Sequence, residues 1–117
     1  MKLPVYLNRD NAETLRLYLE DAGGREVSAT AFLAAVTRAQ LVTRAGTIDT
    51  DTSPQSLSID AVDQTITLKL GSHFSAPGAY PAQLVLFSPS YPNGYVWIDR
   101  HGAEPNRRLV LNVVAGS

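Results

Sequence analysis

The two histidines, His73 and His101, are the residues best suited to acid–base or metal chemistry, because the 117-residue chain has no cysteine. His101 follows Asp99 by two positions, and a His–Asp pair could polarise a nucleophile or bind a metal ion. A metal site needs several ligands at compatible spacing, and no serine lies in a Gly-x-Ser-x-Gly sequence. We therefore interpret residues 99–102 as a polar turn that closes a strand. We predict no catalytic residue and no metal ligand.

The remaining motifs that could bind an ion or a phosphate are incomplete. Asp49 and Asp51 have the spacing of calcium-loop carboxylates, but neither a turn glycine nor a closing glutamate follows them. We expect both to lie in a solvated loop over Gly46–Ser56. Asp60 and Asp63 flank a predicted tight turn, where aspartate commonly bonds to the nearby backbone. No glycine sequence matches a phosphate-binding loop, so we predict no cofactor.

Aromatic side chains gather in the last third of the chain: Tyr80, Phe87, Tyr91, Tyr95 and Trp97. On a strand, Tyr95 and Trp97 share one face, while Val96 and Ile98 share the other, so both faces are apolar. We favour core packing, with Trp97 buried between two sheets. One alternative is a protein interface with Tyr91, Tyr95 and Trp97 as anchors. The other is a stacking platform for sugars built from the same three residues.

The elements that must position these residues follow a period of two. Apolar and polar side chains alternate over residues 15–20, 65–70 and 108–113, which is typical of strands with one face towards a core. Asp60–Asp63 and Asn93-Gly94 separate apolar runs and predict hairpin turns. The pattern therefore predicts antiparallel sheets packed as a sandwich or closed as a barrel.

One segment, Ser28–Leu41, fits two structures. As a strand it is apolar on both faces from Phe32 to Val36, which suits a buried central position. As a helix it would be capped by Ser28 or Thr30 and would place Phe32 and Val36 on one apolar face. We favour the strand, because the surrounding segments are β.

The length and the net charge of the chain restrict the number of domains and the kinds of partner that we expect. The chain suits one domain, residues 1–117, that is large enough to bury a core. Its net charge is −1, from 10 basic and 11 acidic residues, so we expect neither a nucleic acid nor a membrane surface as partner. Met1–Asp10 has no apolar run suited to a signal peptide, and the apolar stretches are too short to span a membrane. We expect synthesis in the cytoplasm.

The order of these segments carries a resemblance to a known family. The segments are Leu15–Gly24, Ala31–Arg38, Leu57–Leu70, the Pro77-Gly78-Ala79-Tyr80 step into Gln83–Phe87, and Leu109–Val114. Together they resemble the immunoglobulin-like β-sandwich modules of phage tails and baseplates, such as the N-terminal domain of baseplate upper proteins. The Pro-Gly-x-Tyr step before an alternating strand is the most telling part, and other immunoglobulin-like domains share it. The resemblance covers most of the chain, in pattern more than in identity.

The resemblance implies an all-β fold, an immunoglobulin-like antiparallel β-sandwich, with one short helix within 28–41 as the alternative to a strand. It also implies a non-enzymatic structural module of a phage or prophage tail or baseplate. Such a module would be made in the bacterial cytoplasm and assembled into the virion, where it binds other tail subunits or a second copy of itself. The alternative function is a carbohydrate-binding module using Tyr91, Tyr95 and Trp97. A small hydrolase would instead need His101 beside a nucleophile.

Overall fold

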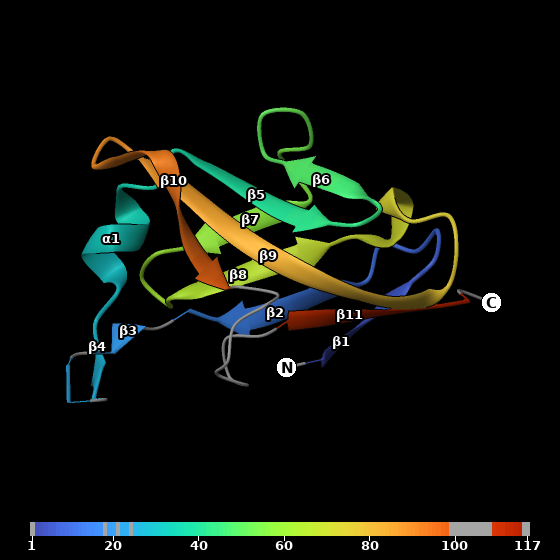
Figure 1. The fold of residues 1–117 in the computed structure, drawn as a ribbon, viewed down its shortest axis with the longest axis horizontal. Coiled ribbons are helices and arrows are strands. Elements are labelled where there is room, and N and C mark those ends of the chain that lie inside the picture. Colours follow the sequence, from blue (N-terminus) through green and yellow to red (C-terminus); the bar gives the residue numbers. More distant parts are fainter. Residues whose placement is uncertain (1, 18, 21, 24, 99–108, 116–117) are drawn as a thin grey trace.

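Two β-sheets lie face to face in the computed structural model, which describes residues 2–17, 19–20, 22–23, 25–98 and 109–115 (Figure 1). The larger sheet has the order β1 (Lys2–Tyr6), β11 (Leu109–Val114), β9 (Gly78–Ser88), β5 (Arg38–Thr43) and β6 (Gly46–Asp49), and β10 (Tyr91–Ile98) also pairs with β9. The smaller sheet has the order β2 (Ala12–Arg16), β8 (Thr65–Lys69) and β7 (Leu57–Asp60). The chain between β2 and β5 forms a two-stranded ribbon, β3 (Leu19–Glu20) and β4 (Glu26–Val27), and then the helix α1 (Thr30–Ala34). A 3-10 helix, η1 (Gly71–His73), follows β8.

The strand order confirms the predicted sandwich. Across the smaller sheet, β2, β8 and β7 occupy the places of strands B, E and D of an immunoglobulin-like domain. In the larger sheet, β5, β9 and β11 occupy the places of strands C, F and G. The pairing is antiparallel with one exception among the described strands, because β1 runs parallel to β11, with Lys2 beside Val110 and Tyr6 beside Val114. This pair makes the larger sheet mixed, while the smaller sheet is antiparallel.

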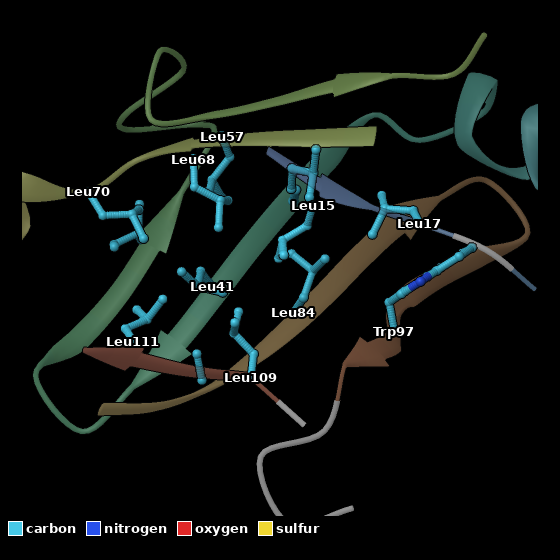
Figure 2. Close-up of a cluster of buried hydrophobic side chains, with 14 of the residues drawn as sticks. Leu15, Leu17, Leu41, Leu57, Leu68, Leu70, Leu84, Trp97, Leu109 and Leu111 are labelled. Atoms are coloured by element: carbon cyan, nitrogen blue, oxygen red, sulfur yellow. The ribbon is translucent and has the colours of Figure 1, made fainter. Parts of the chain in front are cut away.

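The core lies between the sheets and comes from the alternation noted in the sequence. Figure 2 shows leucines of the smaller sheet, such as Leu15 and Leu68, pointing towards Leu41, Leu84 and Leu111 of the larger sheet. All five are buried. Removing one such side chain from water stabilises the fold by about 1.5–3 kcal/mol. Along β5, β8, β9 and β11, alternate residues therefore contribute to holding the two layers together.

The segment Ser28–Leu41 contains a short helix followed by a strand. The favoured prediction of a strand from Ala31 was wrong, because α1 spans Thr30–Ala34, and the alternative helix is shorter than the 28–41 segment. The helix ends early because the N–H of Thr37 bonds to the C=O of Phe87 at 2.9 Å. This bond draws the chain into the larger sheet, and β5 begins at Arg38.

Two of the predicted turns have different outcomes. The hairpin at Asp60–Asp63 is confirmed, since it joins β7 to β8, and Asp60 Oδ1 accepts the N–H of Asp63 at 2.9 Å. The hairpin turn at Asn93-Gly94 was wrong. Ser88 pairs directly with Tyr91, so the turn is Pro89-Ser90, and Asn93-Gly94 lies inside β10. The expected loop over Gly46–Ser56 is also partly wrong, because its first four residues form β6.

Candidate functional site

Four aromatic rings pack together where α1 meets the β9–β10 hairpin, at one end of the sandwich (Figure 1). The Phe32 ring of α1 is central: its centroid lies 5.4 Å from that of Tyr91, 5.1 Å from Tyr95 and 5.2 Å from Trp97. Tyr95 in turn lies 5.2 Å from Tyr91 and 6.0 Å from Trp97. We call these four residues the aromatic cluster.

A bulge in β10 brings the cluster together. Tyr91 pairs with Ser88 and Tyr95 with Leu86, so β10 advances four residues while β9 advances two, and two residues of β10 are extra. Gly94 lies in the bulge with φ of +93°. A Cβ there would lie 2.6 Å from Val85 Cγ1, so glycine is required for both conformation and space.

Burial changes steadily across the cluster. Trp97 is only 5% exposed and belongs to the core, Phe32 and Tyr95 are half-buried, and Tyr91 is 42% exposed. The structure thus brings together all three aromatic residues singled out in the sequence, but only Tyr91 offers a largely free ring. Phe32 was not predicted as part of the site. No sequence signal pairs it with residues 91–97, because the contact joins distant parts of the chain.

The ring geometry favours contact with a protein over stacking on a sugar. Tyr91 and Tyr95 are inclined at 65°, and Tyr95 and Trp97 at 63°. A sugar platform of the kind considered above needs coplanar exposed rings, whereas these rings pack edge to face against one another. Such packing holds an exposed tyrosine rigidly on an apolar base, as at the centre of many protein interfaces.

The hairpin that carries Tyr91 has no charged residue of its own. Residues 84–98 include no Asp, Glu, Lys or Arg, and the tip from Ser88 to Tyr95 consists of Ser, Pro, Tyr, Asn and Gly. Tyrosine, serine, asparagine and glycine are the residues that recognition loops of antibodies use for adaptable contacts. The hairpin and α1 also stand where the F–G and B–C loops of variable immunoglobulin domains bind their ligands. The composition of the hairpin tip and its position in the fold therefore both favour a recognition surface.

A polar network lies on the outer side of β5 and β6, where a solvated loop was expected. Asp49 is only 8% exposed. Its carboxylate accepts hydrogen bonds from the Arg38 guanidinium, from Gln40 Nε2 at 2.8 Å and from the N–H of Asp51 at 2.9 Å. The Arg38 hydrogen bonds hold the pKa of Asp49 well below its usual range, and burial opposes this effect only in part. The prediction of solvation was wrong for Asp49, whose role is to anchor the following loop.

A serine and a histidine that are distant in sequence form a hydrogen bond. Ser56 Oγ lies 2.7 Å from His73 Nε2. Such a contact resembles the nucleophile–base pair of hydrolases, but no carboxylate of the described residues bonds to the His73 ring. The contact joins η1 to the loop before β7. The predicted turn at Asp99 and His101 lies outside the described residues.

No group of three His, Asp or Glu residues that could hold a metal ion occurs within the described ranges. Among these residues, no helix has the length and apolar character that crossing a membrane requires. A scan against protein-family models finds no match to the chain, and a search of curated proteins finds no significant relative.

Proposed function

We propose that this chain is a non-enzymatic protein-binding module of a phage or prophage tail or baseplate, and that it binds a neighbouring virion subunit through the end that carries Tyr91. The observation that carries the proposal is the aromatic cluster: the rings of Phe32 and Tyr95, which themselves pack on Trp97, hold the half-exposed Tyr91 on an uncharged hairpin tip. Rigid aromatic anchors surrounded by neutral polar groups are typical of protein-binding surfaces.

The tail or baseplate setting rests on the sequence resemblance, and two features of the fold support it. The two-layered β-fold is the architecture that the resemblance implies. The sheets also form a stiff frame whose two insertions, α1 and the β9–β10 hairpin, meet at one end. Rigid frames that present a small contact surface suit repeated assembly, because little conformational entropy is lost on binding.

The test is co-expression of the chain with each tail and baseplate protein encoded beside its gene. We expect one of them to form a stable complex with it during size-exclusion chromatography. Tyr91→Ala should weaken that complex by about tenfold or more, the cost of losing an aromatic anchor. The matched control is Val62→Ala, because Val62 is 81% exposed in the β7–β8 turn.

Two outcomes would contradict the proposal. A chain that binds none of the neighbouring structural proteins is not a tail module. A complex weakened equally by Tyr91→Ala and Val62→Ala does not use the aromatic cluster. Circular dichroism of both variants separates loss of contact from loss of fold.

A further inference from the structure

Most edges of the two sheets are closed to further pairing. β1 carries Pro4 at its centre, and β10 carries Pro92 and the bulge; both features block the addition of a strand. On β6 the outward C=O of Asp49 already accepts the N–H of Ser53 at 2.7 Å.

The edge of β7 differs, because its unpaired backbone groups face an open space. The N–H of Lys69 bonds to the C=O of Ser56, and this bond fixes the alternation along the β7–β8 ladder. Ser58 and Asp60 therefore point their backbone groups towards β8. Leu57 and Ile59 point theirs away from it, so two N–H and two C=O groups line the free edge.

A cleft of about 300 Å³ lies beside this edge. β7 forms one wall with Leu57, Ser58 and Ile59, and residues 36–39 at the start of β5 form the opposite wall. Thr50 and Pro54 complete the lining. The walls combine aliphatic and hydroxyl groups with the side chain of Arg38, whose guanidinium is already bonded to Asp49. The cleft therefore suits a short aliphatic or hydroxyl side chain.

We propose that this cleft binds an extended peptide segment of a partner, which adds as a fourth strand to the free edge of β7 and places alternate aliphatic or hydroxyl side chains between β7 and β5. An extended main chain is the occupant whose donors and acceptors repeat at the spacing of Leu57 and Ile59. A second copy of the whole domain fits less well, because residues 36–39 face β7 across the cleft and a whole sheet would have to enter beside them. This site is separate from the Tyr91 surface and does not depend on it.

The test uses the full chain labelled with ¹⁵N and a library of acetylated hexapeptides in which Val, Ile or Leu alternates with Thr or Ser. We expect saturable amide shifts at Leu57, Ile59 and Ala39 with at least one peptide. Ile59→Pro removes an outward N–H and should weaken binding by about tenfold, while Ile59→Val keeps the N–H and should change affinity by less than about threefold.

Because Ile59→Pro changes packing as well, the bound peptide supplies a second test. Two versions of the peptide are N-methylated, one on each of the two alternating sets of amides. Only one version therefore loses the N–H groups that face β7. We expect one version to bind as the parent peptide does and the other to fail. Equal binding by both, binding by neither, or shifts outside β7 and residues 36–39 would overturn the proposal. So would edge shifts that depend on protein concentration without any peptide, since these indicate pairing of two copies.

Discussion

Asp49 shows how one buried carboxylate organises its surroundings. It bonds to Arg38 and Gln40 on β5 and to the backbone of Asp51, while its own C=O accepts the N–H of Ser53. The strand β6 and the loop that follows it are thereby fixed to the sheet. Asp51 contributes less, because its side chain is 64% exposed and makes one ion pair with Arg38 at 3.2 Å.

We predict that Asp49→Asn lowers the free energy of unfolding by about 1–2 kcal/mol at neutral pH, the usual worth of hydrogen bonds to a charged group. Asp51→Asn, the matched control, should cost less than about 0.5 kcal/mol, since exposed ion pairs are weak. Urea denaturation of the three proteins measures both changes. Equal effects would show that burial of Asp49 does not matter.

The same carboxylate predicts a pH dependence. Its pKa is lowered in the folded state, so its stabilising effect is complete above the unfolded-state pKa of about 3.9. The effect declines as the pH falls from there towards the lower folded-state pKa. The difference in stability between the wild type and Asp49→Asn should therefore be constant from pH 5 to 7, within about 0.3 kcal/mol, and shrink below about pH 4. A difference that grows in acid would contradict this sign.

At the scale of elements, the β9–β10 hairpin depends on its bulge and α1 depends on Phe32. The helix is only five residues long and has no side-chain cap bond. Isolated helices of this length are unstable in water, so the buried Leu33 and the contacts of Phe32 within the aromatic cluster hold α1 in place. In β10 the bulge places residue 94 so close to Val85 that only glycine, which has no Cβ, fits there.

We expect Phe32→Ala to destabilise the protein by about 2–3 kcal/mol, because a half-buried ring and three aromatic contacts are lost. The emission of Trp97, the only tryptophan of the chain, should shift to longer wavelength as water approaches it. Phe32→Leu keeps apolar volume and should cause a smaller change. An unaltered emission spectrum for Phe32→Ala would exclude the proposed support of Trp97.

Gly94→Ala should cost about 1–3 kcal/mol, because the added Cβ meets Val85 Cγ1 at a backbone conformation that alanine rarely adopts. Asn93→Ala is the control, since Asn93 is exposed in the same bulge and its replacement should change stability by less than about 0.5 kcal/mol. Thermal unfolding of the two variants gives the comparison. Similar midpoints for both would mean that the bulge adapts freely.

At the scale of the whole molecule, a close crossing of backbones ties the two sheets together beyond the core. Gly71 follows β8 of the smaller sheet, and its C=O accepts the N–H of Asn8, which follows β1 of the larger sheet, at 3.0 Å. A Cβ on Gly71 would lie 2.1 Å from the backbone oxygen of Arg9 and 2.4 Å from that of Tyr6. Tyr6 ends β1, so its oxygen cannot move away without disturbing that strand.

Gly71→Ala is therefore expected to destabilise the fold by more than about 3 kcal/mol, beyond the range of ordinary substitutions. Ser72→Ala, at the exposed neighbouring position, should be close to neutral. Soluble yield and chemical denaturation distinguish the two. A Gly71→Ala protein as stable as the wild type would show that the two connections can separate without cost.

The sequence was sufficient to predict the two β-layers but not the contacts between segments that are distant in the chain. Alternation placed Leu15, Leu68 and Leu111 correctly in the core, because a strand's faces follow from spacing alone. It could not reveal α1, since Phe32 to Val36 suits either structure and the bond from Thr37 to Phe87 decides the outcome. In the same way, the three aromatic residues were found by composition. Phe32, and the partners of Asp49 and His73, depend on contacts between distant segments.

The parallel pairing of β1 with β11 also determines how the domain would respond to a mechanical force. Lys2 lies at one end of this pair and Val114 at the other. Tension applied through the two ends of the described chain would slide the strands past each other, so all the hydrogen bonds between them would have to break together. An antiparallel pair pulled from one end would instead open bond by bond, at a much lower force. The geometry of this single edge therefore favours resistance to tension along the chain.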